Sequence, residues 1–188
     1  MPEKGYKKNL ILYLSLIGFF GIFTTTMAKN PVLPLFVKGM GGSPEVIGII
    51  SAISPLAGIL FSFPVGMLSD RIGKRKILLI SGGVFLTAPL LYLFVSDPWY
   101  LIPVRFFHGL ATAILGPVAS AAIAEAYDET KGEKLGIYSS ATLIGRTLAP
   151  IAGGALISYF MHRGGLFPYK SVYVAAFLAS VPAFLFCF

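Results

Sequence analysis

The sequence predicts an all-α membrane protein with six transmembrane helices. Hydrophobic residues make up 56% of the 188 residues, charged residues only 12%, and the mean hydropathy is +0.81. A soluble domain carries about twice that fraction of charged residues. The apolar residues also form blocks of about 20, which is the length that a helix rising ~1.5 Å per residue needs to cross a hydrocarbon layer ~30 Å thick.

Six apolar segments are the expected membrane helices, taken together as one bundle over residues 1–188. Turn and charge signals separate them: "KGMGGSPE", "SDRIGKRK", "SDP", "YDETKGEK" and "HRGGLFPYK". Prolines inside several segments are compatible with membrane helices, because neighbouring helices and hydroxyl side chains can satisfy the freed carbonyls. The expected spans cover residues 9–37, 44–69, 76–96, 98–127, 134–160 and 168–188.

The first segment has a second interpretation, as a secretory signal. Its apolar run "NLILYLSLIGFFGIFTTTMA" is longer than the usual signal core of about 7–15 residues, and no clear small-residue cleavage site follows it. We therefore expect the first segment to remain as a span.

The distribution of Lys and Arg predicts the orientation. Nine of these residues lie on the side of the N-terminus, including Lys4, Lys7 and Lys8, and three lie on the opposite side. The positive-inside rule therefore places both termini and the cluster between the second and third spans in the cytoplasm. We expect an integral protein of the plasma or inner membrane.

Several classes of function are excluded by composition. The net charge of +7 comes from Lys and Arg residues that are scattered between and within the apolar segments. A nucleic-acid site needs its basic residues together on one solvated face. Cys187 is the single cysteine, and the two histidines, His108 and His162, assemble no metal site and no nucleophile–base pair. We expect no nucleic-acid partner, no cofactor or metal, and no enzymatic activity.

Three cations fall inside the spans: Lys29, Arg105 and Arg146. A charge near the bilayer centre costs about 2.5–3.5 kcal/mol on insertion scales, and an arginine cannot avoid this cost by losing its proton. Ser139, Thr142 and Arg146 follow an i, i+3, i+7 spacing, so they share one helix face. This face is expected to line a polar cavity; the alternative is a structural bond from the arginine to a carbonyl of another helix.

A second polar patch lies toward the outer end of the first span. Thr26, Lys29 and Asn30 belong to it and are candidate substrate contacts, although Lys29 could instead extend to the outer interface. None of the Asp and Glu residues falls in the middle of a span. Cations without a neighbouring acid favour an anionic or acceptor-rich substrate.

Small residues recur at four-residue spacing in the second, fourth and fifth spans. Such stripes let helix backbones approach closely in lipid. They serve either static packing or the sliding of helices past one another. The stripes are Gly58, Ser62 and Gly66; Thr112, Gly116, Ser120 and Ala124; and Ala141, Gly145, Ala149 and Gly153.

The loop between the second and third spans holds a dense charge cluster, "GMLSDRIGKRK". It resembles the signature G-x-L-a-D-r-x-G-r-k-x-x-l of the major facilitator superfamily of transporters, with Lys74 in place of the usual arginine. The matching residues are Gly66, Leu68, Asp70, Arg71, Gly73, Lys74, Arg75 and Leu78.

Two further spans resemble motifs of the same family. In the fourth, Leu101, Arg105 and Gly109 match l-x-x-x-R-x-x-q-G-x-g, while His108 replaces the glutamine and Ala111 the second glycine. The fifth span is similar to the antiporter motif G-x8-G-x3-G-P-x2-G-G, with Ala149 replacing the glycine before the proline. Its matching residues are Gly136, Gly145, Pro150, Gly153 and Gly154.

The resemblance implies the N-terminal six-helix half of a secondary active transporter, built from two inverted three-helix repeats over about 9–96 and 98–188. Alternating access around a central site, with efflux by antiport and protons as the coupling ion, is the implied mechanism. Because the family normally has twelve spans, a second six-helix half, on the same or a different chain, is the expected partner. The alternative is a non-transporting membrane subunit or a half-size homo-oligomeric scaffold.

The resemblance also implies roles for single residues. Arg105 and His108 join the cavity set, and the charge cluster acts as a cytoplasmic gate. In that gate Asp70 pairs with Arg71 or Lys74, or caps a helix N-terminus of the second half. Glu125 resembles the acidic partner at the inner end of the fourth span.

Overall fold

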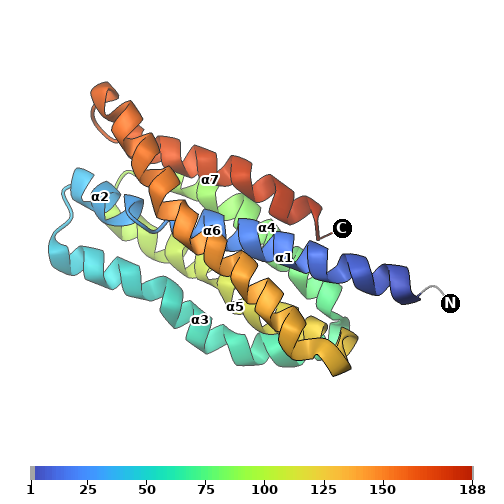
Figure 1. The fold of residues 1–188 in the computed structure, drawn as a ribbon. Coiled ribbons are helices and arrows are strands. Elements are labelled where there is room, and N and C mark those ends of the chain that lie inside the picture. The colour runs from blue at the N-terminus through green and yellow to red at the C-terminus, as the bar shows by residue number, and fades with distance from the viewer. Residues whose placement is uncertain (1–2, 188) are drawn as a thin grey trace.

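The computed structural model describes the backbone of residues 3–187 and the side chains of residues 9–187. Within this range the chain forms a bundle of long helices joined by short turns (Figure 1). The helices are α1 (Glu3–Met27), α2 (Val32–Gly39), α3 (Pro44–Ile72), α4 (Lys74–Leu93), α5 (Leu101–Ala126), α6 (Lys131–Phe160) and α7 (Phe167–Leu185), with short 3-10 helices η1 (Pro98–Tyr100), η2 (Asp128–Thr130) and η3 (Met161–Arg163).

Six stretches of the described chain are long and apolar enough to cross a membrane, which confirms the predicted fold class. Because the number of spans is even, the start of α1 and the end of α7 lie at the same end of the bundle (Figure 1). The first expected span overlaps α1 and α2, and each of the others overlaps one long helix, with ends shifted by a few residues. The spans are Asn9–Gly39, Pro44–Ile72, Lys74–Leu93, Pro98–Ala126, Asp128–Arg163 and Phe167–Leu185.

The first span is not one continuous helix, as the sequence suggested, but two. Pro31 and Pro34 have no amide hydrogen to donate, and the residue before a proline avoids the helical conformation. The break is closed by local bonds instead: the amides of Lys29 and Asn30 both donate to the carbonyl of Thr26, at 3.0 and 2.8 Å. The break therefore sets Lys29 and Asn30 in irregular backbone within the span.

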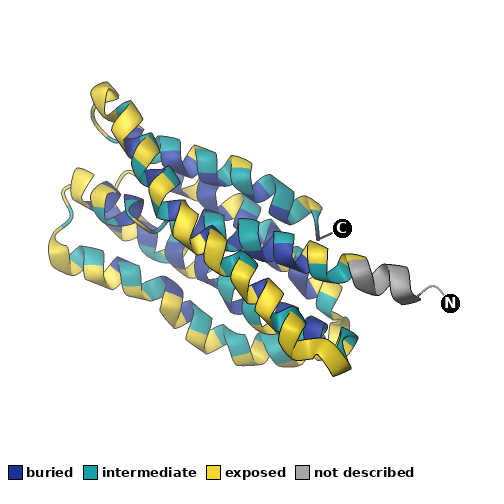
Figure 2. Ribbon diagram, in the orientation of Figure 1, coloured by how far each residue is buried: buried dark blue, intermediate teal, exposed yellow. Residues whose placement is uncertain are grey.

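The helices pack mainly in two pairs, α1 with α6 and α3 with α5, while α4 packs on α5 and α7. Their side chains form two apolar clusters. One surrounds Phe85 and Leu115, and the other surrounds Phe36 and Tyr173. The helices differ in how much of their most apolar stretch is buried inside the bundle. This share is 50% for α4 and for the span that contains α5, but 17% for α3 and 22% for the span of α6. The outer faces of α3 and α6 are therefore largely exposed (Figure 2).

Candidate functional site

The centre of the candidate site is His108 of α5, which is 1% exposed and lies where the two apolar clusters meet. Both of its ring nitrogens have hydroxyl partners from other helices. Thr25 Oγ1 of α1 lies 3.0 Å from Nε2, and Tyr92 Oη of α4 lies 3.2 Å from Nδ1. The imidazole therefore ties α1, α4 and α5 together through hydrogen bonds.

Arg105 lies one helical turn from His108, on the same face of α5, and has no solvent exposure. Its Nη1 donates to Tyr92 Oη at 3.4 Å, while its Nε and Nη2 have no hydrogen-bond partner within the described part of the chain. Tyr92 in turn stacks on Tyr173 of α7, with ring centroids 4.3 Å apart and planes 5° from parallel. We refer to Thr25, Tyr92, Arg105, His108 and Tyr173 as the interior polar cluster.

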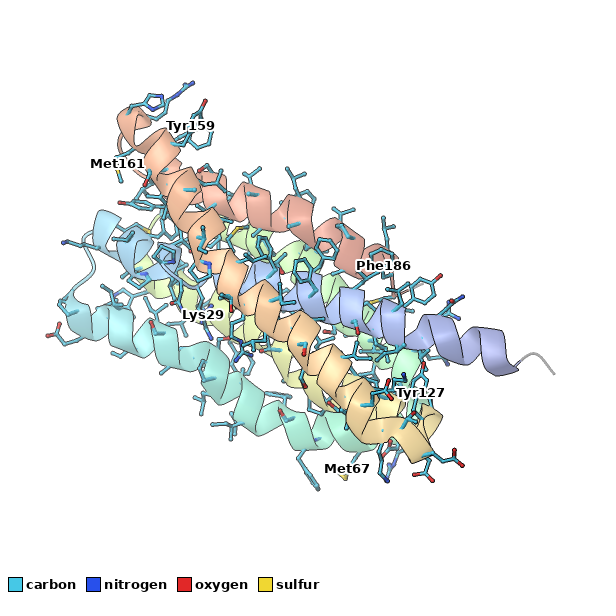
Figure 3. All side chains as sticks on the ribbon, viewed as in Figure 1. Lys29, Met67, Tyr127, Tyr159, Met161 and Phe186 are labelled. Atoms are coloured by element: carbon cyan, nitrogen blue, oxygen red, sulfur yellow. The ribbon has the colours of Figure 1, made fainter. Side chains whose placement is uncertain are left out.

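A second group of candidate residues lies on the side of the bundle where α3 and α6 are largely exposed, which we call the open side. Lys29 is half-buried, and it lies close enough to Arg105 and to Arg146 for both charges to repel its own. Figure 3 labels Lys29, which in this view is seen between the ribbons of α3 and α6. Arg146, near the middle of α6, is exposed. The three intramembrane cations therefore converge on one region, although Arg105 is enclosed and Arg146 is not.

The remaining cavity candidates border this region. Thr142 is half-buried against α1, where its methyl group would lie 2.9 Å from a Cβ built on Gly18, and its hydroxyl donates to the Ser139 carbonyl. Ser139 and Asn30 are exposed, and Thr26 is half-buried. Their contact with a substrate remains a prediction.

The charge cluster lies at the turn between α3 and α4. Lys74 Nζ lies 3.2 Å from Asp70 Oδ1 and 2.6 Å from Glu125 Oε1, at the end of α5. Arg71 and Lys74 were the two expected partners of Asp70 within this chain, and in the structure Asp70 forms its ion pair with Lys74. Arg71 and Arg75 are exposed on the same turn. Figure 3 labels Met67 and Tyr127 at this end of the bundle.

Both carboxylates of this network are more than 60% exposed, so each ion pair stabilises the closed arrangement by only about 0–1 kcal/mol. Gly73 forms the turn with φ +99°, a conformation that side-chain-bearing residues rarely adopt, which explains the second glycine of the signature. Gly66, in contrast, has open space around it.

The glycines of the antiporter-like motif divide between two faces of α6. A Cβ on Gly145 would lie 2.6 Å from the Phe19 carbonyl oxygen, and Gly153 faces Met27, so both contact α1. Gly136 and Gly154 have no described atom within 4 Å of an added Cβ. Pro150 lies within α6, beside the buried Ala149.

Sequence reasoning did not single out three members of the interior polar cluster. Thr25 adjoins Thr26, the predicted contact, in the sequence, and only the rotation of α1 shows that the Thr25 hydroxyl points inward to His108. Tyr92 and Tyr173 carried no usable signal, because tyrosines are common in membrane helices and nothing local distinguishes these two. Among the described residues, no group of His, Cys, Asp and Glu side chains could hold a metal ion.

The fold and its six long apolar spans define a polytopic helical membrane protein with polar residues in its interior. Residues 14–188 match the Major Facilitator Superfamily, and the chain belongs to this family. The predicted family is thereby confirmed, as is the prediction that the chain is not an enzyme, because this is a family of transporters.

Sequence relatives include transporters from archaea and bacteria. The chain is 32% identical over 142 residues to an uncharacterized MFS-type transporter of Methanocaldococcus jannaschii, covering 73% of this chain and 37% of that protein. It is 32% identical over 169 residues to the multi-drug resistance efflux pump PmrA of Streptococcus pneumoniae, covering 85% and 41%. It is 29% identical to the multidrug resistance protein MdtG of Salmonella arizonae, covering 83% and 40%.

Solved structures agree on the fold. The tetrameric PepTSo2 structure superimposes with a TM-score of 0.85 at 15% identity, over 96% of this chain and 40% of that one. A bacterial homolog of the human lysosomal transporter Spinster, in an inward-facing and unoccupied conformation, gives 0.78 at 19% identity, over 98% and 42%. The chain thus spans about two fifths of the length of these relatives, which corresponds to one six-helix half.

Proposed function

We propose that this chain is one six-helix half of a secondary active transporter that exports a small anionic molecule by alternating access. Membership of the family supports transport, and the names of PmrA and MdtG support efflux. The antiporter-like motif of α6 supports exchange, with protons as the proposed coupling ion.

The observation that carries the proposed substrate class is the convergence of Lys29, Arg105 and Arg146. The acidic residues of the sequence all fall in loops or near helix ends, so this region has no carboxylate to neutralise it. Leaving such charges uncompensated in a membrane is costly. A substrate carrying a carboxylate or another anionic group would compensate them, with Lys29 and Arg146 as direct contacts on the open side and Thr26, Asn30, Ser139 and Thr142 as polar neighbours.

The network of Lys74, Asp70 and Glu125 is the proposed cytoplasmic gate. Because its ion pairs are weak and exposed, water can separate them when the gate opens. The count of Lys and Arg supports a cytoplasmic position for this end and for both termini. Lys4, Lys7 and Lys8, which contribute to that count, lie outside the described side chains.

The proposed partner is a second six-helix half, on the same or another chain. The largely exposed apolar faces of α3 and α6 and the two-fifths coverage of the relatives support this partner. A central site between two halves would place Arg146 at an interface rather than against lipid. The two inverted repeats within this half remain part of the proposal.

Transport is tested with the full chain in liposomes that carry an imposed pH gradient. The probes are carboxyfluorescein, an organic anion, and ethidium, an organic cation. We expect gradient-dependent movement of the anion, reduced in Arg146→Ala and retained in the control Lys131→Ala, which removes an exposed cation that pairs with Asp128 away from the site.

Three other results are informative. Movement of ethidium alone would support transport and reject the anionic substrate. Movement without a pH gradient would reject proton coupling. Movement of neither probe, in a chain that inserts and assembles, would favour the non-transporting subunit or scaffold.

A further inference from the structure

A hydrogen bond joins the start of α1 to the end of α5. The amide of Ile11 donates to the hydroxyl of Tyr127 at 3.1 Å, across 116 residues of sequence. Tyr127 directly follows the last residue of α5, and its own amide donates to the Ile123 carbonyl at 3.0 Å. Figure 3 labels Tyr127 at the end of the bundle that holds the charge cluster. Tyr127 belongs to none of the motifs that define that cluster.

This bond positions α1 rather than completing its backbone pairing. Inside a helix, an amide has an acceptor in the carbonyl four residues earlier, and Ile11 lies well inside α1, which begins at Glu3. The Tyr127 hydroxyl is therefore an additional acceptor. Ile11 and Tyr127 also pack against the apolar cluster around Phe85 and Leu115, so packing holds the Tyr127 ring in place independently of its hydroxyl.

The same short segment holds part of the proposed gate. Glu125, two residues before Tyr127, lies 2.6 Å from Lys74 Nζ, and Lys74 also pairs with Asp70. The Nζ of Lys134, in the first turns of α6, lies 6.0 Å from the centroid of the Tyr127 ring. The end of α5 is thus connected to α1 through Tyr127, to α3 and α4 through Glu125, and to α6 through Lys134.

The segment between the two contacts is too short to move in parts. Two residues of a helix are separated by about 3 Å along the axis and about 200° around it, so Glu125 reaches α4 and Tyr127 reaches α1 from opposite sides of α5. The Tyr127 amide bonds to the Ile123 carbonyl and the Thr130 amide to the Tyr127 carbonyl, both at 3.0 Å, which closes the helix end. A backbone displacement that takes Glu125 away from Lys74 therefore moves Tyr127 as well.

We infer that Tyr127 is a positioning residue of the gate, whose hydroxyl couples the start of α1 to the ion pairs of Lys74. The inference rests on the proposed function, which defines the gate. It adds α1 to that gate: when the ion pairs separate, the contact with Ile11 is released with them. Because α1 is one continuous helix that also carries Thr26, a proposed neighbour of the substrate, it links the substrate position to the gate.

Static packing of Tyr127 against α1 is the alternative, and the two differ in what a distant change does. If the contact only packs, loss of the hydroxyl affects the start of α1 alone. If it couples, the loss also loosens the turn between α3 and α4. Loss of the ion pair then loosens α1 in return, because coupling between two sites is reciprocal.

Hydrogen exchange of the full chain in lipid nanodiscs, followed by mass spectrometry, measures both regions in one sample. The reporters are peptides that cover residues 9–15 of α1 and residues 69–77 at the turn between α3 and α4. The second peptide includes the amides of Gly73 and Ile77, which donate to the carbonyls of Ser69 and Gly73 at 3.0 and 3.4 Å. In Tyr127→Phe, which keeps the ring, exchange at residues 9–15 should rise roughly two- to tenfold, the factor that one neutral hydrogen bond represents. Coupling predicts a rise at residues 69–77 as well.

The reciprocal variant is Glu125→Gln. It removes the ion pair with Lys74 and should raise exchange at residues 9–15, although it touches nothing in α1. Asp128→Asn is its matched control, because this carboxylate lies on the same turn and pairs with Lys131 instead, at 3.2 Å. The control should leave exchange at residues 9–15 at the wild-type rate.

Tyr13→Phe is the control for Tyr127→Phe. Tyr13 lies two residues from Ile11 on the same helix, but its ring is exposed and contacts Phe186. Removal of this hydroxyl should leave exchange at residues 69–77 unchanged. In the double variant of Tyr127 and Glu125, the rise at residues 9–15 should fall short of the product of the two single rises, because both changes break one coupled unit.

Exchange at residues 172–183 of α7 shows whether a variant unfolds as a whole. If Tyr127→Phe raises exchange there too, Glu125→Gln, which leaves Tyr127 intact, decides between coupling and packing. Wild-type exchange at residues 69–77 in Tyr127→Phe, wild-type exchange at residues 9–15 in Glu125→Gln, or a full product in the double variant would each overturn the inference.

These results are separate from the liposome assay, because exchange needs no substrate. A chain that moves neither probe can still show the coupling. A chain that transports without the coupling would retain the proposed function and lose only the role of Tyr127.

Discussion

Gly109 and Gly58 lie on neighbouring helices and show how differently the two sides of this bundle use small residues. A Cβ on Gly109 would lie 2.7 Å from the Ser54 carbonyl oxygen, whereas one on Gly58 would meet nothing within 4 Å. The same contrast holds on α6 between Gly145, which contacts α1, and Gly154, which is open. We refer to these as the closed and open sides of the bundle.

Small residues at regular spacing therefore have two separate roles in this bundle. On the closed side, they let the backbones of α1 and α6, and of α3 and α5, approach each other. On the open side, they leave smooth surfaces on α3 and α6 with no partner among the described residues. Changes on the closed side should therefore affect stability, and changes on the open side should affect function.

The largest expected effect on stability is that of Gly109→Ala. The added methyl group must displace the backbone of Ser54, and overpacking of this kind costs about 1–3 kcal/mol, more than the gain of about 0.5–1 kcal/mol from better helix propensity. Each kcal/mol lowers the unfolding midpoint by about 2–4 °C, measurable by circular dichroism in detergent. An unchanged midpoint would show that α3 and α5 are not closely packed here.

Arg146→Ala tests the open side. Because Arg146 is exposed on α6, its loss should leave the unfolding midpoint nearly unchanged. A charged hydrogen bond to a substrate is worth about 1.5–3 kcal/mol, so affinity should fall by roughly 10- to 100-fold. Binding is measured by titration of a transported compound; unchanged affinity for every such compound would remove Arg146 from the site.

Asp70→Asn should have a smaller effect, on the gate alone. The exposed pair with Lys74 is worth about 0–1 kcal/mol, so transport rates in vesicles should fall up to about fivefold while membrane insertion stays normal. Glu125→Gln should give a similar reduction, because Lys74 bridges both carboxylates. Wild-type rates in both variants would reject the gate.

The smallest effect is expected for Gly58→Ala, the matched control for Gly109→Ala. With open space around it and a helical backbone, the new methyl group should be neutral or raise the stability by up to about 1 kcal/mol. A loss as large as that of Gly109→Ala would mean that the α3 stripe packs against something even in the isolated chain, such as a second copy.

The sequence by itself determined the number of spans, their approximate ends and the family. These depend on local properties: the length of an apolar run, the turn residues that interrupt it, and motifs that lie within one turn or one helix. The spacing of the fifth-span glycines agrees with the two faces that the structure shows. Gly136, Gly145 and Gly154 follow one another at nine-residue intervals, and at about 100° per residue each step reverses the face of the helix.

Only the tertiary structure decided which face of α6 meets α1, and that Thr25 rather than Thr26 points inward toward His108. It also decided that Tyr92 accepts a hydrogen bond from Arg105 and stacks on Tyr173. These contacts join residues that are far apart in the sequence. The local sequence pattern does not determine how each helix is rotated about its axis or shifted along its neighbours. In a membrane, the apolar surroundings do not fix that rotation, since lipid and helix interior are similarly apolar. Close backbone approach at Gly145 and Gly109, together with the hydrogen bonds of His108, fixes the rotation instead.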